Sequence, residues 1–285
     1  MKKLLLGLLA LALAVPAAAK PGLWVVRDAD TEVTLFGTVH ALPKGVNWLS
    51  PAITKQLGSA DSVVVEAVIP EDPSALAPVV AQLGISPGLK PIAKRLPPDV
   101  AKELMPAATA AGVPVVALDK METWLAALTL SQQTMANIGI TAGEGVEPVI
   151  MMRARAAKQP IVGLETVEQQ FGYLDTLPEA DQVVMLVSAI EEVAVIKDET
   201  ARMTAMWQAG DVDALAKAFA ADSDGSDRLL KVLLTDRNKR WADWIAGVMN
   251  QPGKVFIAVG AGHFGGEEGL LALLKAKGLT VERIE

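Results

Sequence analysis

The sequence predicts an α/β protein with a mostly parallel or mixed central sheet, flanked by helices and carrying a largely helical middle insertion. Short, continuous apolar runs occur towards both ends of the chain, and such runs suit strands that are covered on both faces. Helical patterns separate these runs. From Met121 to Asn250 the pattern is almost entirely helical, apart from one strand near residues 160–164.

The first 19 residues are predicted to be a secretory signal peptide. Lys2 and Lys3 precede an apolar stretch from Leu4 to Val15, and three alanines ending at Ala19 form a small-residue cleavage site. The apolar stretch is shorter than the roughly 20 residues needed to span a bilayer, although an uncleaved anchor is the alternative. We therefore expect cleavage after Ala19, a periplasmic or secreted location, and no stable membrane insertion of the mature chain.

Composition narrows the class of protein further. The mature chain, residues 20–285, is predicted to form a single domain, with a helical subdomain at about 121–250. The sequence contains no cysteine, which excludes disulfides and thiolate metal ligands. Loss of Lys2 and Lys3 takes the formal net charge from −7 to −9, and no basic cluster is present. This acidic surface argues against nucleic acid as a partner. The sequence does not indicate the oligomeric state.

The individual elements follow from local patterns. Strands are expected at Leu23–Arg27, Val33–Phe36, Ser62–Val68, Pro114–Leu118, Pro160–Leu164, Lys254–Val259 and Thr280–Ile284. Helices are expected at Val100–Ala111, Trp124–Met135, Val146–Lys158, Thr166–Leu177, Ala180–Gln208, Asp211–Ala221, Asp227–Met249 and Glu267–Lys277.

Both histidines of the chain lie in the same four-residue frame. His40 ends Gly37-Thr38-Val39-His40 and His263 ends Gly260-Ala261-Gly262-His263, and each frame follows an apolar β-type run. A strand that ends in glycine and then delivers a histidine places an imidazole at the rim of a sheet. The repeated frame predicts that the two rings meet, which favours a metal site or acid–base chemistry.

Carboxylates also follow predicted strands. Glu66 lies inside an apolar run, where an unpaired acid is costly to bury, so a functional role is favoured. For Asp119, a role as a helix cap or a loop residue is favoured over a functional role. For Glu165, the two roles are about equally favoured. Two imidazoles with carboxylates form a nitrogen and oxygen donor set that suits Mn, Co, Fe or Zn. Glu66 is then either the third ligand or the general base for a bound water.

Later in the chain, Arg237 and Asn238 precede Trp241 on a predicted helix. The tryptophans and methionines of this region fall at helical spacing, which favours core packing. Arg237 is different, because an arginine on a packing helix can clamp a carboxylate or an oxyanion. Arg237, Asn238 and Glu165 are therefore the candidate substrate-binding residues.

Taken together, these residues resemble the TraB/GumN family, which includes PrgY and the Tiki proteases, and the order of elements fits the GumN-like branch. The matching segments are Leu35–His40, Glu66, Gly163–Thr166 with Gln169, Arg237-Asn238 with Trp241, and Val259–His263. The resemblance implies a fold related to erythromycin-esterase-like and haem-binding ChaN-like proteins. It also implies a metal-dependent peptidase that favours Mn²⁺ or Co²⁺, with His40, Glu66 and His263 as the metal-binding or catalytic set.

The sequence thus predicts an exported metal-dependent hydrolase that acts on a peptide or protein substrate. Two alternatives remain open. The same residues at the rim of the sheet also suit a non-catalytic binding protein for a peptide signal, a metal or haem. The chain also fits an accessory role in envelope polysaccharide assembly.

Overall fold

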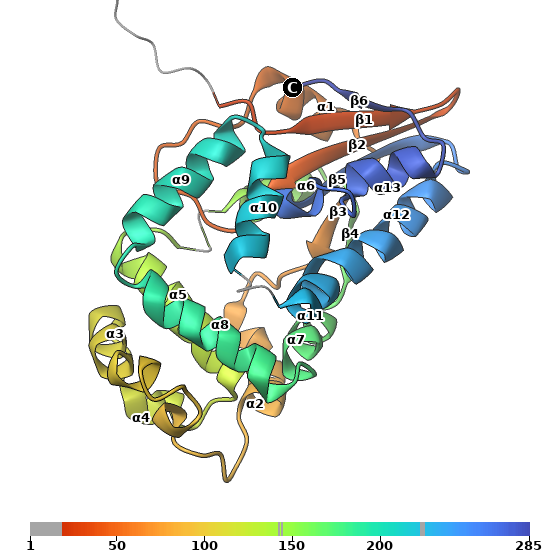
Figure 1. Ribbon diagram of the computed structural model, residues 1–285. Coiled ribbons are helices and arrows are strands. Elements are labelled where there is room, and N and C mark those ends of the chain that lie inside the picture. The colour runs from red at the N-terminus through yellow and green to blue at the C-terminus, as the bar shows by residue number, and fades with distance from the viewer. Residues whose placement is uncertain (1–18, 142, 144, 223–225) are drawn as a thin grey trace, which may run out of the picture.

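A computed structural model describes residues 19–141, 143, 145–222 and 226–285, and it confirms the predicted α/β architecture (Figure 1). Its centre is a six-stranded mixed sheet with the strand order β4-β3-β5-β2-β1-β6. Neighbouring strands from β4 to β2 run parallel, whereas β1 and β6 are antiparallel additions at one edge. The strands are β1 (Leu23–Arg27), β2 (Thr31–Thr38), β3 (Ser62–Ala67), β4 (Ile161–Glu165), β5 (Gly253–Gly260) and β6 (Val281–Arg283). The predicted signal peptide lies outside the described residues, except for Ala19, and stays a prediction.

The register of the parallel strands brings their carboxyl ends to one edge of the sheet. Thr38 of β2 pairs with Gly260 of β5, so the two histidine frames begin side by side. On the other side of β5, Ala67 of β3 pairs with Glu165 of β4. The carboxyl ends of β2, β5, β3 and β4 therefore meet, as expected for the parallel strands predicted from the apolar runs.

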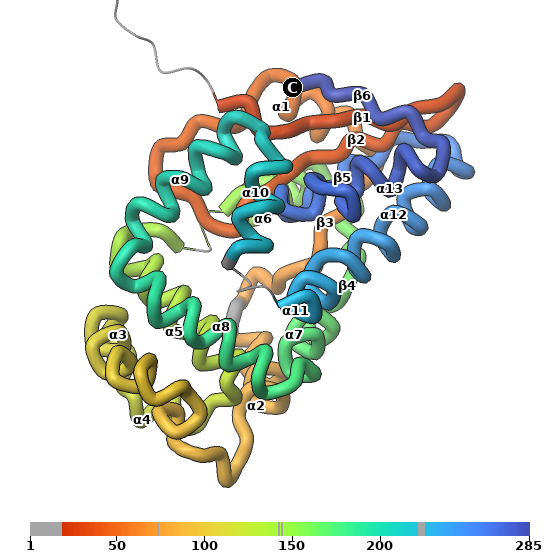
Figure 2. The backbone as a smooth tube through the Cα atoms, in the orientation of Figure 1, coloured from red at the N-terminus to blue at the C-terminus, as the bar shows by residue number. Residues whose placement is uncertain are grey.

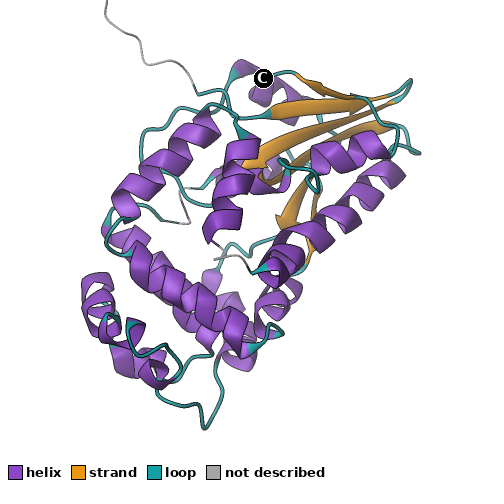
Figure 3. Cartoon of the chain, viewed as in Figure 1, coloured by secondary structure: helices purple, strands orange, loops and turns teal. Residues whose placement is uncertain are grey.

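Helices cover both faces of the sheet (Figure 3). In Figure 1, α12 (Asp236–Val248) and α13 (Leu270–Ala276) lie in front of the sheet, with α1 (Pro51–Ser59) and α6 (Val146–Ala156) behind it. The core between these layers is fully buried and includes Phe36, Phe256 and Ile257.

A second hydrophobic core lies away from the sheet, among the helices at the lower left of Figure 2. Its residues include Ile92, Leu104, Leu118, Leu130 and Leu186. The elements of this region are η1 (Pro73–Leu76), α2 (Ala77–Gly84), η2 (Ile92–Lys94), η3 (Val100–Lys102), α3 (Leu104–Ala111), α4 (Val115–Leu118), α5 (Thr123–Asn137) and α8 (Glu179–Glu192). Within the described ranges, no helix is long and apolar enough to cross a membrane.

The remaining helices return the chain to the sheet. They are α7 (Val167–Asp175), α9 (Ile196–Gln208), α10 (Val212–Asp222), α11 (Asp227–Leu230), the π-helical turn η5 (Lys231–Thr235) and the 3₁₀ turn η6 (Ala261–His263). Trp207 of α9 and Trp241 of α12 belong to the core of the sheet, not to the helical core.

The predicted strand Pro114–Leu118 is wrong, because this segment forms the short helix α4. A short apolar run bounded by proline reads equally well as a buried strand or as a helical turn, and the packing of its neighbours decides. Here Leu118 is buried in the helical core while Val116 is 65% exposed. Asp119 consequently follows no strand.

Two predicted helices are interrupted. The expected helix Ala180–Gln208 divides at Val193 and Val195 into α8 and α9, at β-branched residues that lower helix propensity. The expected helix Asp227–Met249 contains the π-helical turn η5, which lies just before Arg237. Helices α1 and α2 were not predicted from the sequence.

We expect Trp207→Phe to lower the free energy of unfolding by about 1–3 kcal/mol, measured by chemical denaturation. The Trp207 indole is buried, and its Nε1 donates to the carbonyl oxygen of Gly37 at 2.9 Å. The variant leaves this buried acceptor without its donor. Trp244→Phe is the matched control, because Trp244 is 38% exposed. Equal effects in the two variants would contradict the assigned role of the hydrogen bond.

Candidate active site

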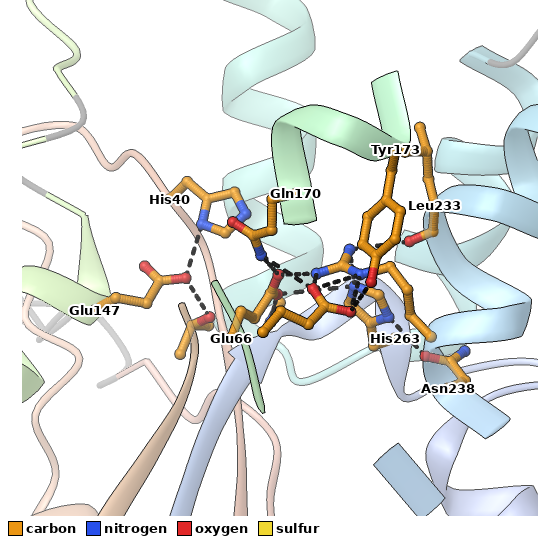
Figure 4. Close-up of polar contacts among 12 residues, drawn as sticks. His40, Glu66, Glu147, Gln170, Tyr173, Leu233, Asn238 and His263 are labelled. Atoms are coloured by element: carbon orange, nitrogen blue, oxygen red, sulfur yellow. Dashed lines mark hydrogen bonds and ion pairs between the residues drawn. The ribbon is translucent and has the colours of Figure 1, made fainter. Parts of the chain in front are cut away.

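Four neighbouring strands deliver ionisable side chains to the same edge of the sheet (Figure 4). Glu66 is the penultimate residue of β3, and Glu165 is the last residue of β4. His263 ends the turn η6 that follows β5, and His40 lies two residues beyond β2. Open α/β sheets bind ligands beyond the carboxyl ends of their strands, so this edge is the candidate active site.

Arg237 of α12 joins the two glutamates. Its Nη2 donates to Glu66 Oε2 at 2.6 Å and to Glu165 Oε2 at 2.8 Å. Its Nε donates to both carboxylate oxygens of Glu165, at 3.1 and 3.0 Å. None of the three side chains is more than 9% exposed. Charge-assisted hydrogen bonds in such a buried position are strong, so this network fixes α12 against β3 and β4.

Glu66 is ionised despite its burial. Burial alone opposes ionisation, but the charge of Arg237 holds the pKa of Glu66 well below its usual range. The Gly260 N–H also donates to Glu66 Oε1 at 2.8 Å, and Gln170 donates to Oε2 at 3.2 Å. A Cβ on Gly260 would lie 3.0 Å from Glu66 Oε1, so the glycine makes room for the carboxylate.

His263 is buried and neutral. Burial is the main reason that its pKa falls to about 3. Asn238 Nδ2 donates to the carbonyl oxygen of Glu268 at 2.9 Å, which leaves Asn238 Oδ1 as the acceptor for His263 Nδ1 at 2.6 Å. The proton is therefore assigned to Nδ1, and the lone pair of Nε2 faces Arg237 Nη1 at 3.2 Å. Since this ring is uncharged, Arg237 is the cation that stabilises Glu66.

Arg240 and Tyr173 complete the surroundings of Glu165. Its Oε1 accepts from the Tyr173 hydroxyl at 3.2 Å and from Arg240 Nη2 at 3.4 Å. Arg240 Nη2 also donates to the Tyr173 oxygen at 2.9 Å. The Arg240 side chain is 51% exposed, so this second arginine is in contact with solvent beside the buried network.

His40 stands apart from this network and faces solvent. Its Nδ1 donates to Glu147 Oε1 at 2.8 Å, and the Thr38 hydroxyl donates to the same oxygen at 2.6 Å. The charge of Glu147 is the main reason that the pKa of His40 rises to about 9. The His40 side chain is 72% exposed, so water screens this pair. With Nδ1 held by Glu147, Nε2 is left for other partners.

The structure brings five of the predicted site residues together, namely Glu66, Glu165, Arg237, Asn238 and His263. His40 influences Glu66 and His263 electrostatically, but no hydrogen bond or ion pair between His40 and His263 is found within the described ranges. Asp119 lies elsewhere, where its carboxylate accepts from the Ile92 N–H at 2.7 Å. This contact agrees with the capping reading of Asp119.

Sequence reasoning missed four residues of the site: Glu147, Gln170, Tyr173 and Arg240. Glu147 lies in the first turn of α6, where an acidic residue is expected simply to complement the helix dipole. Arg240 lies one turn beyond Arg237, and this spacing places both arginines on one helix face. That spacing was the one usable signal in the sequence.

The predicted metal site is not formed as a cluster of donors. Among the residues that the structure describes, no three histidine, aspartate or glutamate side chains are grouped so that they can hold a metal ion. The nearest pair of predicted ligands is Glu66 Oε1 and His263 Nε2, which are 3.8 Å apart.

Comparison with known proteins identifies the family of the chain and two relatives that match it over nearly their whole length. A family model described as "TraB/PrgY/gumN family" matches residues 22–283. The chain is similar to "Uncharacterized protein YbaP" of Escherichia coli and of Shigella flexneri, with 22% identity to each over 260 residues. The match covers 90% of this chain and 92% of each relative. An "Uncharacterized protein" of Treponema pallidum is 22% identical, over 57% of this chain and 52% of its own length. No solved structure matches the chain.

We expect the two histidines to titrate very differently in an NMR experiment on the imidazole C–H signals. His40 should change its charge near pH 9, because Glu147 stabilises the protonated ring. His263 should stay neutral from neutral pH down to about 3. The conservative variant Glu147→Gln should lower the pKa of His40 towards its ordinary value and leave His263 unchanged. Two rings that both titrate near 6.5 would contradict this description of the site.

Proposed function

Because the chain belongs to the TraB/PrgY/gumN family, we propose that it is an exported hydrolase that cleaves peptide bonds at this edge of the sheet. The family match covers almost the whole mature chain, and three of the site residues that carry the resemblance, Glu66, Arg237 and His263, meet in space. The family and its relatives do not themselves name a reaction, so the assignment depends on the chemistry of the site.

The observation that carries the proposal is the pairing of His40 with Glu147. An imidazole whose Nδ1 is bound to a carboxylate has a fixed tautomer and orientation, and its Nε2 is directed to other groups. Thr38 holds the same carboxylate oxygen, so Glu147 is itself fixed. His40 is also the most exposed ionisable group among the predicted site residues, and it is therefore accessible to a substrate.

The proposed reaction uses His40 as the proton carrier. Because Glu147 raises the pKa of His40 to about 9, little of the ring is unprotonated at neutral pH, so cleavage should speed up towards pH 9. In the unprotonated form, Nε2 takes a proton from a water molecule as the water oxygen bonds to the carbonyl carbon of the substrate. The carbon–nitrogen bond then breaks, and His40 gives the proton to the departing amine nitrogen. The products are a carboxylic acid and an amine, and no oxidant or further reactant is required.

Most residues of the buried network support this reaction without contacting the substrate. Arg237, Asn238 and Glu165 are predicted substrate-binding residues, but each is buried and bound to protein groups. We assign them to positioning, because their contacts fix the charges that face His40. Arg240 is the exposed cation, and it suits a carbonyl or carboxylate oxygen of the substrate.

A peptide is favoured over other substrates by the edge strand β4. Among the described strands, β4 pairs only with β3, so its outer side presents backbone groups to which an extended peptide can hydrogen-bond. Such a peptide must cross the ends of β3 and β5 to reach His40 beyond β2. A cavity of about 410 Å³ borders its end at Glu165, between the segments after β3 and the start of α7. Exposed Val68, Ile69 and Val162 add apolar surface along the same edge.

A divalent ion does not fit the arrangement of the predicted ligands. The resemblance implies Mn²⁺ or Co²⁺, with Zn or Fe as further options, held by His40, Glu66 and His263. Arg237 instead donates to both Glu66 and His263, and His40 is bound to Glu147. No step of the proposed reaction is therefore routed through a metal.

His40→Ala should lower the rate of peptide cleavage by about 100- to 10,000-fold, because it removes the proton carrier. The measurement is cleavage of a peptide library by the mature protein, followed by mass spectrometry. Since His40 is largely exposed, the variant should stay folded, but loss of the contact with Glu147 should lower its melting temperature moderately. A variant that cleaves like the wild type would refute the role of His40.

The same screen separates hydrolysis from the two rival functions. A binding protein for a peptide signal would retain peptides without cleaving them, and a polysaccharide-assembly accessory would do neither. Glu71→Gln is the matched control for Glu147→Gln, because the Glu71 side chain is 75% exposed and far less confined than that of Glu147. Glu147→Gln should slow cleavage, and Glu71→Gln should not.

A further inference from the structure

We propose that Arg237 takes the place of a divalent ion at this centre, so that the centre works with arginine as its permanent cation. This inference rests on the location of the proposed active site, but not on the reaction assigned to it. It departs from the metal dependence that the sequence resemblance implies.

The hydrogen bonds of Arg237 carry the inference. A guanidinium has five N–H donors, and all five have acceptors here. Nε donates to Glu165, and Nη2 donates to Glu66 and Glu165. Nη1 donates to the Leu233 carbonyl oxygen at 3.0 Å and meets His263 Nε2 at 3.2 Å. Arg237 is thus coordinated by two carboxylates and an imidazole, which is the donor set that a transition-metal ion selects.

An added ion would compete for the same atoms. Manganese or cobalt at Glu66 and His263 would place two positive charges beside a buried guanidinium, in surroundings that screen charge poorly. His263 Nε2 has one lone pair, and this lone pair already accepts the hydrogen bond from Arg237 Nη1. Binding of the ion would therefore require Arg237 to leave.

Departure of Arg237 is opposed by its packing. The guanidinium carbon lies 4.6 Å from the centre of the Trp241 ring and 5.9 Å from that of Tyr173. These aromatic rings attract the cation and restrict its movement. The Arg237 side chain is also only 9% exposed, so water does not already hydrate the guanidinium and ease its displacement.

The charges of the centre are already balanced. Glu66 and Glu165 contribute two negative charges, and Arg237 and Arg240 contribute two positive charges. A resident divalent ion would leave an excess of positive charge in a buried site, which is costly.

The deciding experiment measures metal binding by the wild-type mature protein. After chelation, the protein is titrated with Mn²⁺ and separately with Co²⁺, by calorimetry and by thermal melting. We expect no saturable binding and no rise in melting temperature, because an ion that bound the folded state would stabilise it. One equivalent of either ion, lost in Glu66→Gln, would overturn the proposal.

Arg237→Ala gives the opposite expectation. Removing the guanidinium leaves Glu66, Glu165 and His263 around a vacated space, so this variant should gain Mn²⁺ or Co²⁺ binding and a metal-dependent rise in melting temperature. Arg237→Lys is the matched control, because it keeps the positive charge and should gain no such binding. A folded Arg237→Ala variant that binds no ion would contradict the proposal that Arg237 occupies the place of a divalent ion. If this variant fails to fold, the wild-type titration still decides.

Failure of this inference is distinct from failure of the hydrolase assignment. A wild-type protein that neither cleaves peptides nor binds an ion would refute the hydrolase and support Arg237 as the resident cation. Cleavage that appears only after loading with Mn²⁺ or Co²⁺ would support the hydrolase and overturn the role given to Arg237.

Discussion

The buried fork of Arg237 between Glu66 and Glu165 holds the candidate active site together. The two glutamates stand at the ends of neighbouring parallel strands, where Ala67 pairs with Glu165, so their charges would repel without a cation between them. Arg237 is supplied by α12, far along the chain, and it converts this repulsion into a link between the sheet and the helix. Removing one partner of such a buried pair typically costs about 3–5 kcal/mol, because the remaining charge is left without compensation.

The same fork sets the state of its neighbours. The positive charge of Arg237 favours ionised Glu66 and, together with burial, disfavours a protonated His263. Asn238, the next residue of α12, fixes the ring of His263 through Nδ1. One helix therefore controls the charge of a carboxylate and the tautomer of an imidazole, and the turn η5 just before it supplies the Leu233 carbonyl that holds Arg237 itself.

Local patterns in the sequence were sufficient for part of this arrangement. The GxxH frames located the ends of β2 and β5, and the cost of an unpaired acid in an apolar run correctly indicated that Glu66 must have a partner. The identity of that partner was beyond local reasoning, because Arg237 is 171 residues away in the chain. Glu147 was missed for a similar reason, since an acid in a first helical turn has an ordinary structural explanation. The strand predicted at 114–118 was wrong because so short an apolar run does not determine its own secondary structure.

The two histidines show how far identical local sequence can diverge. After β5 the chain folds at once into the turn η6, which buries His263 against Trp241, with 4.4 Å between the ring centres. After β2 the chain continues without such a turn, and His40 stays exposed beside Glu147. Burial favours the neutral form of one ring, whereas the carboxylate favours the charged form of the other. A pair of metal ligands would need both rings to direct a free nitrogen at one point, whereas His263 Nε2 here meets Arg237 and His40 Nδ1 binds Glu147. The division between a fixed, neutral imidazole and an exposed, proton-carrying one thus follows from what each strand end meets, and not from the frame itself.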